Sequence, residues 1–405
     1  MTRVTHAAPL VILAASARAL AECLRRAGLP SGGAPLLAVD AFGDDDLMAV
    51  VDGWHPLALA NLCEPQRVLA AVGAVLQVRG AARRPGRSDR HGGQDPAMSA
   101  VCSSPAAVLL GGGFDGAPAV LDALSQRHRL LNASPATWLA ARDPLLFDRL
   151  GIAAPETRLD RPADLRGWLR KTVGSSAGLG VGIAAAEAAA GVRVVWQRRV
   201  AGTPASLLFC AHADGILPIG FNRQWCSPTP DLPFRFGGVA SCFDPGETVR
   251  VQMLDAAARV TAETGLRGLC SLDVVVDPHG DAFALELNPR PTASVELYDR
   301  DAPGLLRLHL AAVAGETLPD WRPSAGGRAI AIVHASARLR LAEPPPAVAD
   351  WHRGAEVGVG DPLCTVHATG PDATVAMRRA RSSAGRLLRS LERPKPCDQT
   401  TASAV

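Results

Sequence analysis

The chain has 405 residues, of which 48% are hydrophobic and 20% charged, and its formal net charge at pH 7 is +3. This length predicts two or three domains, the composition excludes global disorder, and the small net charge excludes an overall field that draws the chain to nucleic acid or membranes. The sequence shows no apolar run near the roughly 20 residues of a bilayer span and no signal peptide, so we expect a cytoplasmic protein.

Strands and helices alternate in the first part of the chain. The expected buried strands lie at residues 9–14, 36–39 and 106–110, and the expected helices at 18–27 and 65–77. This alternation predicts a small parallel α/β domain over residues 1–130. The stretch Arg79–Arg90 inside it is rich in arginine but has no aromatic residue to stack a base, so we interpret it as a solvated loop.

The glycines of this first domain disfavour a dinucleotide site. Residues 14–18, after the first strand, read Ala-Ala-Ser-Ala-Arg and lack the Gly-x-Gly-x-x-Gly pattern that lets the backbone approach a pyrophosphate. Gly111–Gly113 follow a strand as well, but residues 114–116 do not complete the pattern.

The rest of the chain is typical of an α+β architecture. Over residues 131–322 short β runs alternate with few helices, one of which is expected at 145–150. Residues 323–393 carry two β segments around Pro344–Pro346 and a final helix, which predicts a β-rich extension. Residues 394–405 predict a disordered tail.

Two strands joined by a tight turn are predicted within residues 270–290. The turn spans residues 277–280, and a short hairpin results if Val276 pairs with Asp281. One face of this hairpin is apolar and packs on a core. Its members are Leu272, Val274, Val276, Phe283, Leu285 and Leu287.

Three oxygen-bearing side chains share the other face of this hairpin. In the expected register Asp273 lies opposite Ala284. Glu286 is the diagonal neighbour of Asp273, and Asn288 follows one step further. Diagonal neighbours lie roughly 7–8 Å apart at Cα, a span that two carboxylates can close around a hard cation. The alternative is a strand with ordinary solvent-exposed polar residues.

A lysine stands before a loop of small residues. Only two of the 42 basic residues are lysines, and Lys395 lies in the polar tail, so Lys171 marks a position that favours a compact ammonium group. A strand that ends at Lys171 opens into Gly174–Gly182, whose amides and hydroxyls can follow phosphate oxygens closely. The lysine precedes the glycines, so this is not a Walker A loop, and a plain flexible loop is the alternative.

A break between two strands follows within residues 194–209. The break is expected at Ala201–Pro204. Free backbone N–H and C=O groups in such a hinge could read the edge of an adenine, whereas the pattern by itself predicts only a β-hairpin.

Taken in order, these segments resemble the ATP-grasp superfamily over residues 131–295, and the first domain resembles the pre-ATP-grasp domain of that superfamily. The resemblance implies an ATP-grasp fold with an N-terminal parallel α/β domain and a C-terminal β-rich extension. It also implies ATP and Mg²⁺ (or Mn²⁺) as cofactors.

Individual roles follow from the same resemblance. It implies that Lys171 holds the α/β-phosphates and that Arg290 steadies the transferred phosphate, both as catalytic residues. The implied metal ligands are Asp273, Glu286 and Asn288. The other implied ATP contacts are Ser175, Ser176, Gly178 and Gly180 in the loop, and Gln197, Arg198 and Val200 in the hinge.

The resemblance is strongest to a branch described as ATP-dependent carboligases, relatives of which occur beside pterin-linked one-carbon genes in methylotrophic bacteria. Residues 112–115, 141–144 and 287–291 carry this likeness. A second lysine, usual at 143–148, is absent, and Arg142 or Arg149 could substitute for it. Two more departures are Pro204 at the usual ribose-contacting position and Ser271 where some amino-acid ligases carry an arginine.

The implied activity is that of an ADP-forming carboxylate–amine ligase that works through an acyl phosphate, in the biosynthesis of a one-carbon cofactor such as a pterin or a furan. We expect small-molecule carboxylate and amine substrates, with Arg223 and Arg235 gripping the carboxylate, and a homodimer is compatible with this reading. Two alternatives stay open: a carboxylase-like enzyme that uses bicarbonate, and a non-catalytic ATP-binding protein.

Overall fold

The computed structural model describes residues 8–78, 105–183, 192–300, 302, 304–323 and 325–392. The expected solvated loop Arg79–Arg90 and the expected disordered tail over 394–405, with Lys395, lie outside the described residues.

A five-stranded parallel sheet forms the N-terminal part, with the strand order β3-β2-β1-β4-β5. Its strands are β1 (Leu10–Leu13), β2 (Leu36–Asp40), β3 (Gly53–Pro56), β4 (Ala107–Leu110) and β5 (Arg129–Leu130). The helices of this part are α1 (Arg18–Arg26), α2 (Asp45–Val50), α3 (Pro65–Gln77) and α4 (Pro118–Ser125), with a 3₁₀ turn at Leu59–Asn61. The three predicted strands and two predicted helices are confirmed, whereas α2, β3, α4 and β5 were not predicted.

The central strands β1, β2 and β4 of this sheet are almost wholly buried, as is usual where crossover helices cover a parallel sheet. One face packs on α3 and α4, with Val72 and Leu121 fully buried. The other face packs on α1 and on helices from the middle of the chain, where Leu305 is fully buried. The N-terminal sheet therefore shares one core with the rest of the molecule.

An antiparallel sheet of eight strands forms the centre, with the order β14-β13-β10-β11-β12-β15-β19-β17. Its strands are β10 (Thr203–His212), β11 (Gly215–Cys226), β12 (Phe236–Ala240), β13 (Gly268–Val276), β14 (Ala282–Asn288), β15 (Gly327–His334), β17 (Val348–Ala349) and β19 (Pro362–Gly370). Strands on both sides of the predicted boundary at residue 323 belong to this sheet. Strands β15, β17 and β19 of the C-terminal segment thus extend the central sheet.

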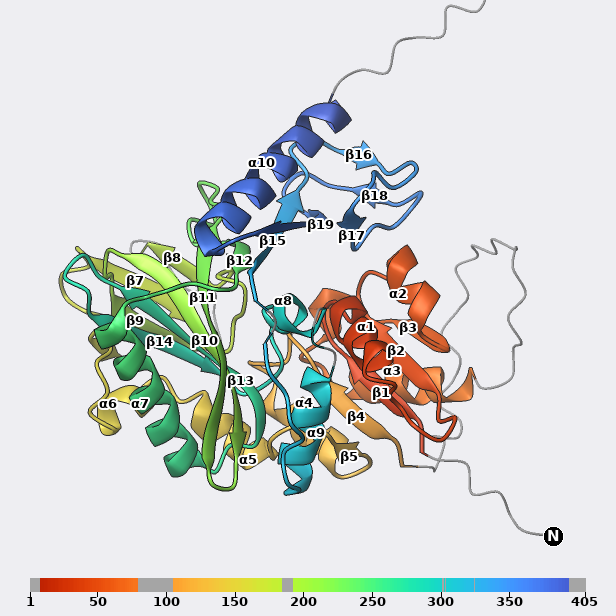
Figure 1. Ribbon diagram of the computed structural model, residues 1–405, viewed down its shortest axis with the longest axis horizontal. Coiled ribbons are helices and arrows are strands. Elements are labelled where there is room, and N and C mark those ends of the chain that lie inside the picture. Colours follow the sequence, from red (N-terminus) through yellow and green to blue (C-terminus); the bar gives the residue numbers. More distant parts are fainter. Residues whose placement is uncertain are drawn as a thin grey trace, which may run out of the picture.

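A smaller sheet has the order β6-β9-β7-β8 and lies beside the central one (Figure 1). Its strands are β6 (Thr157–Arg158), β7 (Trp168–Thr172), β8 (Val181–Ile183) and β9 (Val194–Arg198). A fourth sheet has two strands, β16 (Leu339–Arg340) and β18 (Glu356–Val357).

Helices cover the central sheet and link it to its neighbours (Figure 1). They are α5 (Pro135–Ala141), α6 (Leu146–Arg149), α7 (Glu247–Thr264), α8 (Val295–Asp299), α9 (Leu305–Ala314) and α10 (Ala373–Glu392). The predicted helix at 145–150 is confirmed as α6, and the predicted final helix as α10. The long α7 buries Met253 and Val260 against the central sheet and was not predicted.

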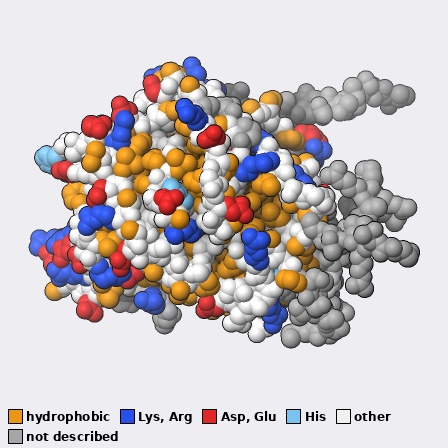
Figure 2. All heavy atoms as spheres, turned by 60° about the horizontal axis from the view of Figure 1, so that its bottom comes forward, with side chains coloured by type: hydrophobic (Ala, Val, Ile, Leu, Met, Phe, Trp, Pro, Cys, Tyr) orange, Lys and Arg blue, Asp and Glu red, His pale blue; other side chains and the backbone are white. Residues whose placement is uncertain are grey.

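The charged side chains on the face drawn in Figure 2 are mixed in sign. Acidic and basic groups gather together along one edge, and apolar side chains lie towards the middle. None of the described helices combines the length and the apolar character that a bilayer crossing requires.

Candidate active site

Two carboxylates face each other across β13 and β14. Asp273 pairs directly with Glu286, and the ladder shifts by one residue between Asp273 and Val274. The expected register, with Asp273 opposite Ala284, is therefore wrong. The turn is one residue longer than expected, because Val276 pairs with Ala282, and the bulge adds a second shift. Two one-residue shifts return Glu286 and Asn288 to the expected face, since one shift alone would have turned them away. The predicted core face is wrong for Phe283 and Leu285, because Ala282 and Ala284 take the core positions between the turn and the bulge.

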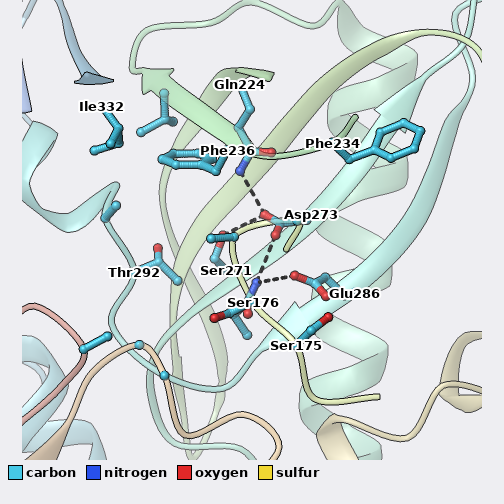
Figure 3. A pocket seen from close by; sticks show the side chains of 18 of the residues that line it. Ser175, Ser176, Gln224, Phe234, Phe236, Ser271, Asp273, Glu286, Thr292 and Ile332 are labelled. Carbon is cyan, nitrogen blue, oxygen red and sulfur yellow. Dashed lines mark hydrogen bonds between the residues drawn. The ribbon is translucent and has the colours of Figure 1, made fainter. Parts of the chain in front are cut away.

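The amide of Asn288 lies between the two carboxylates. Its Nδ2 donates to Asp273 Oδ2 at 2.9 Å and to Glu286 Oε1 at 3.4 Å. Gln224 of β11 donates to Asp273 Oδ1 at 3.1 Å, as Figure 3 shows, and Ser271 donates to the same oxygen at 3.4 Å. The predicted three oxygen-bearing groups are thus brought together, with Gln224 as a neighbour that the sequence did not reveal.

The environment of Asp273 favours a cation. Burial, followed by the like charge of Glu286, raises the pKa of Asp273 to about 7. A divalent cation between the two carboxylates would offset both effects. Among the described residues no three His, Cys, Asp or Glu side chains form a metal-binding group, and the set here has two carboxylates and one amide. Carboxylate and amide oxygens suit Mg²⁺ or Mn²⁺. Asn288 turns its Nδ2 to the carboxylates and its Oδ1 to Arg142 and Arg290, so half a turn of its amide would supply the third oxygen ligand and make these residues fit such an ion.

Lys171 reaches this group from the smaller sheet. Its Nζ donates to Gln197 Oε1 at 3.1 Å and to the carbonyl of Leu285 at 3.4 Å. Leu285 is the extra residue of the β14 bulge, and a bulge leaves its extra residue outside the regular ladder. Burial lowers the pKa of Lys171, and the negative charge of Glu286 opposes that change. The bulge therefore places both Glu286 and an acceptor for Lys171.

Arg142, at the end of α5, is the second cation beside the carboxylates. Its Nη1 lies 3.4 Å from Glu286 Oε2 and donates to the carbonyl of Leu287 at 3.0 Å, and its Nη2 donates to Ser175 O at 3.3 Å. Arg149 instead pairs with Asp143 on the exposed surface. Of the two arginines that could substitute for the absent lysine, only Arg142 lies among the site residues.

Arg290 is the third cation, and its side chain is held by the N-terminal domain. Its Nε donates to Asp115 Oδ1 at 2.9 Å, and its Nη2 donates to Asp115 Oδ2 at 2.7 Å. Burial alone would raise the pKa of Asp115, but the guanidinium of Arg290 outweighs it and holds that pKa below its ordinary value. Asp115 was not predicted as a site residue; its position two residues after the glycines that follow β4 was the available signal.

The loop of small residues between β7 and β8 packs between two other segments. A Cβ added to Gly174, whose φ is +80°, would lie 2.2 Å from the Cα of Gly116. A Cβ added to Gly178, whose φ is +70°, would lie 2.0 Å from the carbonyl oxygen of Phe234. Only glycine allows both approaches. The other predicted loop contacts, Ser175 and Ser176, line a cavity that Asp273 and Glu286 also line, whereas Gly180 packs on Ser175.

The predicted hinge connects two different sheets. β9 belongs to the smaller sheet and β10 to the central one, so the hairpin reading of this segment is wrong. The break is residues 199–202, because β10 already begins at Thr203. Gln197 is buried, and both Gln197 and Val200 line the cavity.

The side chain of Arg198 points away from the cavity. It lies over the ring of Trp168, 4.4 Å from the ring centroid, and its Nη1 donates to Arg166 O at 2.9 Å. Any contact of Arg198 with a ligand in the cavity therefore comes from its backbone.

The two predicted carboxylate-gripping arginines do not line the cavity. On β11 the side chains alternate, so Gln224 faces the carboxylates and Arg223 lies on the opposite face. Arg235 is buried, and it donates to Ser227 O at 2.9 Å and to Gly360 O at 3.0 Å. Its guanidinium thereby joins the β11–β12 loop to the C-terminal segment.

One cavity of about 1210 Å³ is lined by the two carboxylates, by Asn288 and by the three cations Lys171, Arg142 and Arg290. Its walls come from the smaller sheet, the central sheet, the carboxyl edge of the N-terminal sheet and the C-terminal strands. Residues 146–294 match the family model of the ATP-grasp domain. The chain has the ATP-grasp fold.

Solved structures support the ATP-grasp assignment over nearly the whole chain. The biotin carboxylase domain of the Hydrogenobacter thermophilus 2-oxoglutarate carboxylase, in complex with MgADP, ADP and bicarbonate, is 12% identical with a TM-score of 0.66, and the match covers 93% of this chain and 90% of that one. Biotin carboxylase from Campylobacter jejuni is 14% identical with a TM-score of 0.63, covering 95% of each chain.

A third solved structure has the same fold. N5-carboxyaminoimidazole ribonucleotide synthetase from Thermus thermophilus is 16% identical with a TM-score of 0.61, covering 95% of this chain and 99% of that one. Identities this low show the ATP-grasp fold alone. A comparison with curated proteins gave no match.

Proposed function

We propose that the chain is an ATP-dependent carboxylate–amine ligase that works through an acyl phosphate. The observation that supports this most directly is the pair Asp273–Glu286, bridged by the amide of Asn288 and flanked by Lys171. The two facing carboxylates suit the positive charge of Mg²⁺, and the cations beside them suit the negative charge of the ATP phosphates.

Each group has a role in this proposal. Asp273, Glu286 and Asn288 would hold Mg²⁺ or Mn²⁺, which would supply positive charge to the β- and γ-phosphates. Lys171 and Arg142 add fixed positive charge to the phosphates. The orientation that Asp115 imposes on Arg290 suits it to the transferred phosphoryl group.

The remaining predicted residues are proposed to bind the nucleotide. The loop residues Ser175, Ser176, Gly178 and Gly180 would follow the phosphates. Gln197, Val200 and the backbone of Arg198 would meet the adenine. The proposed ATP-grasp domain is residues 131–322, with a pre-ATP-grasp domain at 1–130 and an extension at 323–393.

The reaction has two transfers. A carboxylate oxygen of the acid bonds to the γ-phosphorus as the bond from that phosphorus to the β–γ bridging oxygen breaks, which releases ADP. A neutral amine then adds to the carbonyl carbon of the acyl phosphate, phosphate leaves, and the nitrogen loses a proton to give the amide. The chain's cations stabilise the charge that builds in the first step.

The finer assignment is a cytoplasmic enzyme of the carboligase branch, active in the biosynthesis of a pterin- or furan-type one-carbon cofactor. It rests on the likeness of residues 112–115 and 287–291 to that branch. Asp115 and Arg290, which lie in these two motifs, are in contact, so the motifs meet at one place in the cavity. A homodimer is part of the same proposal.

A bicarbonate-using reaction is the second candidate. Biotin carboxylase and N5-carboxyaminoimidazole ribonucleotide synthetase match more than nine-tenths of this chain in fold, and one of these structures contains bicarbonate. In that case the first acceptor of the γ-phosphoryl group would be bicarbonate. ADP release that needs bicarbonate and no added acid would favour this candidate.

The first test is calorimetric titration of Mg-ATP into the wild type and into the variants Glu286→Gln and Lys171→Met. We expect each variant to lose at least tenfold in affinity. Glu263→Gln is the matched control, because Glu263 is exposed on α7. If the wild type does not bind Mg-ATP, or if both site variants bind as tightly as Glu263→Gln, the proposed site is wrong.

Turnover is tested next by ADP release with mixtures of acids and amines. Release that depends on both substrates supports the ligase. Tight Mg-ATP binding without release under any acceptor or bicarbonate would instead indicate the non-catalytic ATP-binding protein.

A further inference from the structure

The cavity continues past Arg290 to the carboxyl edge of the N-terminal sheet. Ala15, Phe42 and Gly112 line it there, after β1, β2 and β4. Strand β1 lies between β2 and β4, so the strand order reverses here, and ligands of open parallel sheets bind outside the carboxyl ends of strands at such a point. A Cβ added to Gly112 would lie 3.6 Å from Nη1 of Arg290. This end of the cavity is therefore continuous with the proposed phosphate-binding groups.

Apolar side chains of the C-terminal segment form another wall of this cavity. Ile332 comes from β15, Leu363 from β19, and Leu341 follows β16. Figure 3 shows Ile332 and Phe236 near each other, on the side of the pocket away from Glu286. An alkyl or aryl body of a ligand would pack on this wall.

One buried carboxylate oxygen at this end accepts no hydrogen bond within the described part of the chain. Asp44 lines the cavity and is 3% exposed, and its Oδ2 accepts no hydrogen bond from any described residue. Asp44 occupies the N-cap of α2, where an aspartate ordinarily accepts a bond from a helix amide, yet its side chain makes no capping bond. Neither the helix nor another described donor thus satisfies this carboxylate.

The cation beside Asp44 is already neutralised. Arg18 donates to both carboxylate oxygens of Glu296, and its Nε donates to Asp350 Oδ1 at 2.7 Å. Asp46 is another carboxylate beside Arg18, and its Oδ2 lies 3.6 Å from the same Nε. Carboxylates therefore exceed cations among the described residues of this cluster, and a buried carboxylate without a partner is unfavourable until a cation pairs with it.

We propose that this end of the cavity binds the acceptor through a protonated amine that pairs with Asp44. The proposal rests on the proposed ligase function. A nitrogen that is paired with a carboxylate stays protonated and cannot attack a carbonyl carbon. The attacking nitrogen is therefore a second group of the same molecule, and the apolar wall fits a hydrocarbon body between them. The acceptor class is a diamine with an alkyl or aryl spacer.

The titration of Asp44 supports this assignment. Burial, followed by the like charges of Asp350, Asp40 and Asp46, raises the pKa of Asp44 to about 8, against the opposing charge of Arg18. Near pH 7 the carboxyl is therefore protonated in the absence of a ligand. Pairing with an ammonium ion favours the ionised form, so binding releases a proton.

The test is calorimetric titration of the full chain, saturated with Mg²⁺ and a non-hydrolysable ATP analogue, with α,ω-diaminoalkanes of three to six carbons. Asp44→Asn keeps the shape of the side chain and removes its charge. Asp45→Asn is the matched control, because Asp45 is the adjacent residue and its side chain is 46% exposed. We expect Asp44→Asn to weaken diamine binding at least tenfold and to abolish the proton release, and Asp45→Asn to change neither.

A second arm varies the ligand and needs only the wild type. Alkanediols of the same lengths lack the charge and are expected to bind at least tenfold more weakly. Equal affinity of the wild type and Asp44→Asn for diamines, equal affinity of the wild type for diols and diamines, or no diamine binding at any length each overturns the proposal.

Titration of Mg-ATP itself separates this proposal from the proposed function. If Mg-ATP binds but no diamine does, the amine subsite is wrong and the ligase proposal stands. If diamines bind through Asp44 but Mg-ATP does not bind, the subsite stands and the ligase proposal fails. Binding of neither overturns both.

Discussion

Asp115 and Arg290 lie 175 positions apart in the sequence, and three hydrogen bonds of 2.7–3.1 Å join their side chains. Asp115 follows β4 of the N-terminal sheet, and Arg290 follows β14 of the central sheet. Both side chains are buried. The N-terminal domain thereby sets the orientation of a guanidinium that lines the cavity of the ATP-grasp fold.

This pair predicts strong coupling between two distant substitutions. Asp115→Asn and Arg290→Gln each leave a buried charge without its partner, and we expect each to lower the free energy of unfolding by about 3–5 kcal/mol. The double variant is expected to lose clearly less than the sum of the two, because it leaves no unpaired charge. Urea unfolding of the four proteins measures this, and additive losses would show that the pair is not coupled.

The loop after β7 predicts a glycine requirement at one position. Gly174→Ala places a Cβ 2.2 Å from Gly116 Cα at a φ of +80°, so the loop cannot keep its contact with the N-terminal domain. We expect at least a tenfold loss of Mg-ATP affinity. Gly182→Ala is the control, because a Cβ there would meet no atom closer than 4.0 Å. Equal affinities of the two variants in calorimetry would mean that this contact does not matter for the nucleotide.

The position of the Arg198 side chain predicts that its removal affects the stability of the fold but not the affinity for Mg-ATP. Because its side chain lies over Trp168, outside the cavity, Arg198→Ala is expected to change Mg-ATP affinity by less than about twofold. Loss of the cation–π contact is expected to lower the free energy of unfolding by about 0.5 kcal/mol. Calorimetry and urea unfolding measure the two quantities. A large loss of affinity with unchanged stability would mean that the Arg198 side chain contacts the adenine.

Asp44 predicts a specific dependence of stability on pH. Its pKa is raised to about 8 in the folded chain, so the folded state binds a proton that the unfolded state has released between about pH 4 and pH 8. Its ionisation therefore costs stability as pH rises through this window. Asp44→Asn cannot ionise and escapes the cost.

The measurement is the difference in free energy of unfolding between Asp44→Asn and the wild type at several pH values, without ligand. We expect this difference to shift in favour of the variant from pH 5 to pH 9, and Asp45→Asn to show no such trend. A difference that is constant across the range would mean that the pKa of Asp44 is not raised.

Local patterns were sufficient for the elements that carry the candidate site. Alternation of apolar and oxygen-bearing residues predicted the hairpin of β13 and β14 with Asp273, Glu286 and Asn288 on one face. The same pattern could not set the register, because the turn length and the bulge at Leu285 depend on how β14 packs and pairs. A side-chain period of two residues does not distinguish a register from one shifted by two.

The sequence by itself determined the order of the segments, the chemistry of the facing side chains and the lysine before the glycine loop, because these depend on residues close together along the chain. Only the tertiary structure decided that Arg142 rather than Arg149 joins the site, that Asp115 orients Arg290, and that Arg223 and Arg235 do not line the cavity. That Asp44 Oδ2 accepts no hydrogen bond from a described residue is likewise visible only in the fold. Each of these depends on which sheets and loops meet, and contacts between segments more than a hundred residues apart leave no periodic signal in the sequence.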